Sequence, residues 1–289
     1  MNHFIKLIRP HQWIKNLFIL IAPFFGGLFL NPDVIFECIM GITSFSLVSS
    51  AIYVLNDLKD VELDRIHPVK KYRPIPMGQV SQSAAILSLI SFSFLGLSMG
   101  FWLDYAFGYI ASGYFILNVA YCFGLKKVAI IDMVILAFGF VLRTLGGGFL
   151  ADVSMSKWLL IIVFLLSFFL AIAKRRDDIL VFMSSGVSVR KSSEKYNLDF
   201  INAAMTMLST VLIVAYIMYT ISDEVLERIG FEYLYFTAIF VISGVLRYLQ
   251  LALVENNSSS PVKVIYTDRF IQITLFLWVL SFFLILYIY

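Results

Sequence analysis

The chain has 289 residues, of which 60% are hydrophobic and only 14% are charged. Its mean hydropathy is +0.88. A soluble domain carries roughly 25% charged residues, so this composition excludes nucleic-acid-binding proteins, secreted disulfide scaffolds and disordered chains. It indicates instead a protein that crosses a membrane several times. The formal net charge is only +3, so the placement of the charges is more informative than their sum.

Nine apolar runs are long enough to cross a bilayer, since a helical span needs about 20 apolar residues. The first run has no small-residue cleavage site before the next one, so we expect a retained helix and not a signal peptide. No internal repeat and no Pro- or Ser-rich linker divides the chain, which predicts an all-α polytopic membrane protein with one domain over residues 1–289. The predicted spans are 13–30, 35–56, 82–102, 105–123, 128–150, 157–173, 200–221, 231–253 and 269–288.

Basic residues predict the orientation of these spans. All but three of the 22 Lys and Arg residues lie in the N-terminal segment or in alternate loops. Lys157 and Arg228 lie on the opposite side, and Arg143 lies inside a span. Cytoplasmic loops carry the basic excess, so we expect a plasma (inner) membrane protein with its N-terminus in the cytoplasm and its C-terminus outside. The other polar residue types gather in the same loops, so an active site should open to the cytoplasm.

The strongest chemical signal is an acidic motif at the cytoplasmic end of the second predicted span, residues 56–65 (NDLKDVELDR). On a helix, Asp57, Asp60 and Asp64 fall within roughly a 60° arc of one face. Like charges this close repel, and near a membrane they are costly to desolvate. Mg²⁺ removes that cost, and it usually binds one or two carboxylates together with substrate phosphates. We therefore interpret the motif as a Mg²⁺–diphosphate site; the alternative is a solvated helix end with local ion pairs.

A basic loop follows this motif at residues 67–78 (HPVKKYRPIPMG). Its prolines and glycine break any helix, which indicates a shaped loop. Lys70 and Arg73 would place cations beside the carboxylates, and carboxylate-held metal with Lys or Arg opposite is a common way to grip a phosphate. The alternative is an ordinary positive-inside loop.

A second polar cluster, residues 174–178 (KRRDD), ends the sixth predicted span on the same side. Lys174 can form an ion pair with an aspartate three or four positions later, which would make the cluster purely local. Alternatively, Lys174 and Arg175 face the first cluster and bind a phosphate. The stretch 184–195 then either closes over a phosphorylated substrate or forms a solvated loop.

Two charges lie within one predicted span. Asp132 and Arg143 are 11 positions apart and share a helical face within about 20°. Buried charges in spans normally face the bundle interior. The two lie about 16 Å apart along the helix, too far to pair directly. Arg143 should therefore meet either an acidic lipid head group or a structural partner, and the glycines at 146–148 favour close packing over a phosphate cradle.

Nine spans with an NDxxDxxxD motif after the second resemble the UbiA superfamily of intramembrane prenyltransferases. More narrowly, the chain resembles the branch of decaprenyl-phosphate phosphoribosyltransferases (DPPR synthases). The resemblance implies a UbiA-like helical bundle with an active-site cavity that faces the cytoplasm. The segments that carry it are 9–16, 56–64, 67–75, 121–126, Arg143 with the glycines after it, 174–175 and 190–192.

The resemblance implies a glycosyltransferase. A 5-phosphoribosyl group would pass from phosphoribosyl pyrophosphate (PRPP) to a polyprenyl (decaprenyl-type) phosphate in the membrane, with pyrophosphate as the leaving group and Mg²⁺ as the cofactor. In that branch the product serves cell-wall biosynthesis. The alternative is an aromatic prenyltransferase with a prenyl diphosphate donor. One departure is that ordinary members carry a second, spaced Asp motif where this chain has KRRDD.

The candidate site follows from the residues and the resemblance together. Asp57, Asp60 and Asp64 are expected to be catalytic and to hold the metal. No nucleic acid is expected as a partner, and a homo-oligomer is left open. A transporter is disfavoured because the polar residues gather on one side of the membrane. The candidate substrate-binding residues are Asn56, Lys15, Lys70, Arg73, Lys126, Arg143, Lys174 and Arg175.

Overall fold

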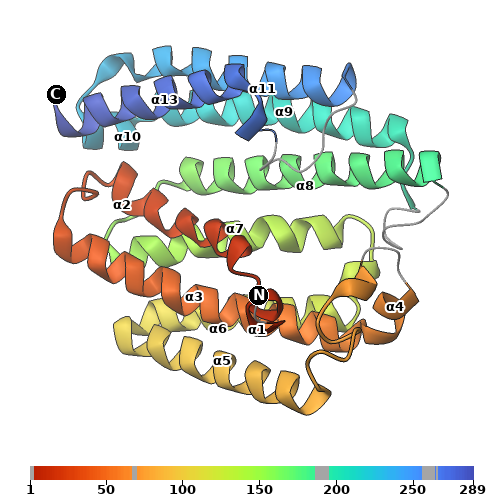
Figure 1. The fold of residues 1–289 in the computed structure, drawn as a ribbon. Helices are drawn as coiled ribbons and strands as arrows, with labels where there is room; N and C mark the ends of the chain where they lie inside the picture. Colours follow the sequence, from red (N-terminus) through yellow and green to blue (C-terminus); the bar gives the residue numbers. More distant parts are fainter. Residues whose placement is uncertain (1–2, 67–69, 186–194, 256–263, 265) are drawn as a thin grey trace. The chain divides into compact units, whose positions relative to one another are not determined.

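The computed structural model describes residues 3–66, 70–185, 195–255, 264 and 266–289, and all regular structure in these ranges is helical (Figure 1). Within them, eight helical segments are long and apolar enough to cross a membrane. The chain is therefore an all-α, multi-pass membrane protein, as predicted. The spanning segments are α3 (Pro32–Lys59), α5 (Gln82–Leu103), α6 (Tyr105–Phe123), α7 (Ile131–Leu150), α8 (Lys157–Ser185), α9 (Leu198–Thr220), η5 (Glu232–Thr237) with α11 (Ala238–Leu253), and α13 (Arg269–Tyr287).

Shorter helices connect or flank these spans. They are α1 (His3–Ile8), η1 (Pro10–Leu20), α2 (Ile21–Phe25), α4 (Val61–Ile66), η2 (Lys70–Tyr72), η3 (Leu125–Lys127) and α10 (Asp223–Ile229).

The first predicted span, 13–30, differs from the expectation. It is divided into the 3-10 helix η1 and the short helix α2, so no single long helix covers it. Pro23 cannot donate a backbone hydrogen bond, and Gly27 has a φ of 75°, which ends the helical run. The described residues thus support eight long spans, and the count of nine stays a prediction.

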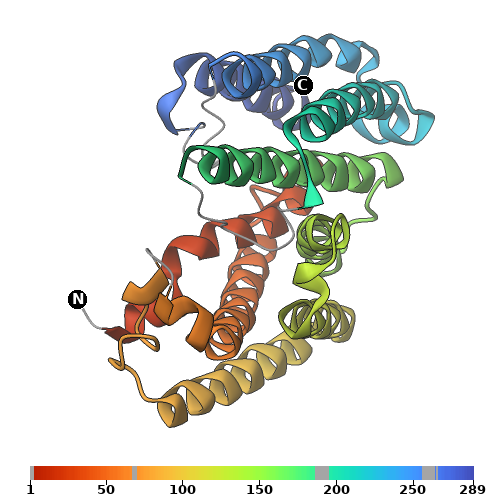
Figure 2. The ribbon, with the colours of Figure 1, turned by 90° about the vertical axis from the view of Figure 1, so that its right-hand side faces the viewer.

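The chain folds as two compact units. The first comprises Met1–Lys126 and Gly139–Ser154, and the second comprises Lys127–Phe138 and Met155–Tyr289. Helix α7 therefore contributes its first turns to the second unit and the rest to the first. In the first unit α3 packs against α5, α6 and η1; in the second, α8 lies beside α9 in both views (Figure 1, Figure 2).

Helix α3 positions the acidic motif. Asn31 caps its start by accepting a hydrogen bond from the backbone N–H of Asp33 at 3.0 Å, and Pro32 occupies the first turn. The helix ends at Lys59, and Asp60 has φ −100° and ψ 5°, outside the helical range. The chain then continues as α4. The acidic motif therefore crosses a helix junction and does not lie on one continuous helix.

Small residues allow close packing around α7 in the first unit. A side chain on Gly147 would overlap the backbone carbonyl of Ile19, and one on Gly146 would press against Phe107. The interpretation of this glycine run as a packing site is confirmed for Gly146 and Gly147. Around it, Phe45, Phe107 and Tyr114 form a buried aromatic cluster with aliphatic side chains.

We predict that Gly147→Ala destabilises the protein, because the added methyl group has no room beside the Ile19 carbonyl. Overpacking of this kind typically costs about 1–3 kcal/mol. The measurement is the thermal unfolding midpoint of the purified protein in detergent. Gly113→Ala in α6 is the matched control, since nothing lies within 4 Å of its added methyl group. Equal midpoints for both variants would contradict the close approach of α7 to η1.

Candidate active site

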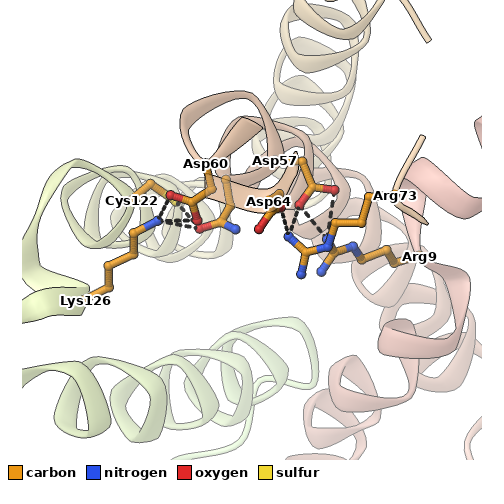
Figure 3. A network of polar contacts seen from close by, with 8 residues as sticks. Arg9, Asp57, Asp60, Asp64, Arg73, Cys122 and Lys126 are labelled. Atoms are coloured by element: carbon orange, nitrogen blue, oxygen red, sulfur yellow. Dashed lines mark hydrogen bonds and ion pairs between the residues drawn. The ribbon is translucent and has the colours of Figure 1, made fainter. Parts of the chain in front are cut away.

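Two of the three predicted aspartates meet around shared basic side chains (Figure 3). Asp57 is buried at the end of α3, and its side chain is 1% exposed. The Nη2 atom of Arg9 lies 2.6 Å and 2.8 Å from its two carboxylate oxygens. The Nη1 atom of Arg73 bridges Asp57 at 2.9 Å and Asp64 at 2.5 Å. Charge-assisted contacts of this length are strong, so they compensate both carboxylates.

The third aspartate points to a different partner. Asp60 binds Lys126, whose Nζ atom lies 2.6 Å from both carboxylate oxygens. The same ammonium donates to the Asn56 side-chain oxygen at 3.1 Å, and the Cys122 thiol contacts that oxygen at 3.8 Å. Figure 3 shows Asp60 directed toward Lys126, apart from the group around Arg73. The expected common face is divided because the helix ends between Asp57 and Asp60.

Asp64 lies on α4, outside the spanning segments. Burial raises the pKa of this carboxyl, although the nearby Arg73 and Lys70 act in the opposite direction. Desolvation of the charged form is thus the larger effect there. A further cation at this position would favour the ionised carboxylate.

The remaining predicted lysines lie on several elements. Lys15 is on η1 and half-buried, and Lys70 is on η2 and half-buried. Lys174 is exposed on α8, in the second unit. Two parts of the predicted site lie outside the described residues: 67–69 and 186–194. The second includes the segment 190–192, which contributes to the family resemblance.

Arg143 has structural partners inside the first unit. Its Nε atom donates to the Asn16 side-chain oxygen at 2.7 Å, and its Nη2 atom donates to the Tyr114 hydroxyl at 2.9 Å. It also donates to the Gly139 carbonyl at 2.7 Å and to Ser49 at 3.4 Å. The side chain is buried, and its guanidinium lies 4.5 Å from the Tyr114 ring centroid. Neutral acceptors and aromatic faces therefore surround this charge, which fits the structural alternative from the sequence.

The second polar cluster forms a buried ion-pair group in the second unit. Arg175 is fully buried and lies 2.8 Å from Asp132 and 3.1 Å from Asp178. Arg176 donates to the Asn202 side-chain oxygen at 2.9 Å. Arg175 therefore holds the start of α7 against α8. Its predicted contact with substrate has no direct support from this arrangement and stays a prediction.

The donor set of the acidic motif suits a hard cation. Asp57, Asp60, Asp64 and Asn56 present carboxylate and amide oxygens, which Mg²⁺ prefers. Among the described residues, however, no three His, Cys, Asp or Glu side chains converge as a metal site. The basic partners Arg9, Arg73 and Lys126 occupy the carboxylates instead. The oxygen chemistry thus fits the ion. To hold it, the carboxylates would exchange these basic side chains for the metal, and the basic side chains would bind another anion.

Arg9 is a residue of this cluster that is not among the candidates predicted from the sequence. Its position before the predicted first span is compatible with a topology signal or with a reach toward an anionic substrate. The pairing with Asp57 joins residues 48 positions apart, so spacing alone could not identify it. Its one local signal was its place in the segment 9–16 that supported the family resemblance.

Known proteins are similar to this chain in fold and in sequence. A solved structure of a UbiA homolog from Archaeoglobus fulgidus, bound to GPP and Mg²⁺, matches with a TM-score of 0.74 and 18% identity, over 98% of this chain and 99% of that one. The decaprenyl-phosphate phosphoribosyltransferase of Mycolicibacterium smegmatis is 31% identical over 95% of this chain and 89% of its own length. The enzyme of that name from Corynebacterium glutamicum is 30% identical over 98% and 86%.

A model of a whole protein family also matches this chain. The model of the UbiA prenyltransferase family matches residues 18–181, which include the acidic motif, Lys126, Arg143 and Arg175. This match covers more than half of the chain, and the relatives above extend it to nearly the full length. The chain therefore belongs to the UbiA prenyltransferase family.

Proposed function

We propose that the protein transfers a 5-phosphoribosyl group from PRPP to a polyprenyl (decaprenyl-type) phosphate and releases pyrophosphate. The observation that carries the proposal is the similarity, at 30–31% identity over nearly the whole chain, to two proteins named decaprenyl-phosphate phosphoribosyltransferase. The clustered acids and bases at the end of α3 supply the groups that such a donor needs. The acceptor lipid suits a multi-pass membrane protein.

Magnesium is part of this proposal, with Asp57, Asp60 and Asp64 as the residues that would hold it. The ion would neutralise the leaving diphosphate. The A. fulgidus homolog bound to Mg²⁺ supports this use of the fold. With a magnesium diphosphate bound, the carboxylates would hold the metal, and Arg9, Arg73 and Lys126 would turn to phosphate oxygens. No buried charge is then left without a partner, which would otherwise be costly.

The residues of the chain then act mainly by electrostatics. Arg73, Lys126 and Arg9 would stabilise the negative charge that develops on the diphosphate as the bond to ribose C1 lengthens. The acceptor phosphate is already anionic at neutral pH, so it needs no strong general base to attack C1 from the opposite face. Inversion at C1 is expected. The remaining candidates for the 5-phosphate or the acceptor head group are Lys15, Lys70, Lys174 and, by resemblance, Arg143 and Arg175.

The topology proposed here follows from the basic loops. We place the N-terminus and the acidic motif on the cytoplasmic side of the plasma membrane, and the C-terminus outside. PRPP is water-soluble and highly charged, so it would reach the site from the cytoplasm through a cavity open to that side. The single-domain organisation over residues 1–289 belongs to the same proposal.

We expect membranes that contain the protein to consume PRPP when polyprenyl phosphates of several lengths are supplied. The measurement is labelled ribose 5-phosphate recovered in the lipid phase. In a parallel reaction, a labelled prenyl diphosphate is offered with aromatic acceptors. Transfer in the second reaction alone would favour the aromatic prenyltransferase alternative.

We predict that Asp57→Asn and Asp60→Asn each lower turnover roughly 100-fold or more, because charge stabilisation of the leaving group is lost. The assay is PRPP transfer by purified protein that still inserts into membranes. Asp33→Asn is the matched control, since Asp33 is exposed at the opposite end of the same helix. Turnover near that of the unmodified protein in both site variants would refute the metal-site hypothesis.

We predict that Arg175→Met lowers the thermal unfolding midpoint strongly, because it leaves Asp132 and Asp178 without their buried cation. Removing one partner of a buried ion pair typically costs about 3–5 kcal/mol. The measurement compares the midpoint with that of Arg65→Met, which removes an exposed pair with Glu62. A normal midpoint together with a raised KM for PRPP would instead support Arg175 as a substrate-binding residue.

A further inference from the structure

Three polar side-chain contacts connect η1 and the residue before it to one face of α3. Arg9, just before η1, binds Asp57 at 2.6 Å. The indole Nε1 of Trp13 donates to the Ser50 hydroxyl at 3.1 Å, and the Asn16 amide donates to the Ser46 hydroxyl at 2.9 Å. The order along the two segments is reversed, so η1 runs antiparallel to α3.

The 3-10 geometry of η1 keeps its two contacts with the serines of α3 in register. Between Trp13 and Asn16 the 3-10 helix makes one turn and rises about 6 Å, at about 2.0 Å per residue. Their partners Ser50 and Ser46 are also about one turn apart, roughly 6 Å along α3 at 1.5 Å per residue. Arg9 precedes this helix and extends the row through its own side chain to Asp57.

Asn16 fixes the inner end of this row. It is fully buried and uses both halves of its amide. Its nitrogen donates to Ser46 on α3, and its oxygen accepts from the Nε atom of Arg143 on α7 at 2.7 Å. Arg143 is itself held by Tyr114 and by the Gly139 carbonyl. The register of η1 is therefore tied to two spanning helices at this residue.

Arg9 lies at the outer end of the row in an unfavourable backbone conformation. Its φ is 52° and its ψ is 61°, the left-handed region that a non-glycine residue rarely adopts. Such a conformation persists only where the surrounding structure enforces it. The Gln12 N–H donates to the Arg9 carbonyl at 2.9 Å, and the guanidinium also lies 5.2 Å from the Tyr53 ring centroid. The placement of Arg9 thus depends on how the following helix is held.

We propose that Asn16 is a positioning residue, which places the Arg9 guanidinium against Asp57 by holding η1 in register on α3. Its partner Ser46 precedes Asp57 by 11 residues, which is about 16 Å along α3. Asn16 therefore cannot touch a diphosphate bound at the Asp57 carboxylate. The inference rests on the proposed function only in requiring that Arg9 binds the diphosphate of the donor. Asn16 would therefore affect the binding of the diphosphate without touching it.

The test is the binding of inorganic pyrophosphate with Mg²⁺ to the full-length protein in detergent, measured by titration calorimetry. Arg9→Gln should weaken binding roughly tenfold, because it removes a charged donor. Asn16→Leu should weaken it by a similar factor. The double variant should bind no more than about twofold more weakly than Arg9→Gln alone, since both changes remove the same contact. Asn16→Asp keeps the acceptor for Arg143, and the Ser46 hydroxyl can donate to the new carboxylate in place of the lost amide bond, so this variant should restore most of the affinity.

Asn118→Leu is the matched control for the loss of an amide. Among the described residues, Asn118 donates to the Tyr114 carbonyl of its own helix at 2.8 Å, so the variant should bind pyrophosphate normally. If Asn16→Leu does not fold, Trp13→Phe replaces it in the same cycle, because it removes the bond to Ser50 midway along the row.

Three results would overturn the inference: no pyrophosphate binding by the unmodified protein, unchanged affinity in the Asn16→Leu variant, or weakening in the double variant equal to the product of the single effects. A failure of the proposed function would look different. Prenyl diphosphates also release pyrophosphate, so an aromatic prenyltransferase would show the same coupling between Asn16 and Arg9 but no transfer from PRPP.

Discussion

Compensation of buried charge is the constraint on which the described structure depends most. A buried carboxylate without a partner costs several kcal/mol. Asp57 meets this requirement through Arg9 and Arg73, and these basic residues lie 48 and 16 positions away in the chain. The contacts that compensate Asp57 are therefore also contacts that tie the start of η1 and the loop after α4 to α3.

Apolar run length predicts most of the helices but not those whose ends depend on distant partners. The predicted spans 82–102 and 105–123 agree with α5 and α6 to within one residue, because Asp104 caps α6 between two continuous apolar runs. By contrast, α8 continues to Ser185, well beyond the predicted end at 173. The charged stretch stays helical because Arg175 finds Asp132 on another helix, which hydropathy cannot reveal. Likewise, hydropathy cannot distinguish the 3-10 segment η1 from an α-helical span.

The same limit applies to the candidate site. The spacing of the aspartates locates the site, since carboxylates three and four positions apart at a membrane edge need compensation. It does not reveal the helix end at Asp60, which turns that carboxylate toward Lys126, 66 positions away. Nor does it decide between a lipid head group and an internal partner for Arg143. That choice depends on Asn16 and Tyr114, neutral side chains that carry no charge signal in the sequence.

The acids and their basic partners occupy different kinds of structure. Asp57 lies in the last turns of a 28-residue helix, which fixes its position. Arg9 precedes a 3-10 helix, Arg73 lies in a loop of turns, and Lys126 lies on the three-residue helix η3. Short irregular segments have fewer backbone hydrogen bonds to lose than long helices, so they can shift at lower cost. An exchange of partners on diphosphate binding would therefore be carried mainly by the cations, while the carboxylates keep their place. In that case the precision of the site depends on how well the irregular segments are anchored, and for Arg9 that anchor is the row of contacts between η1 and α3.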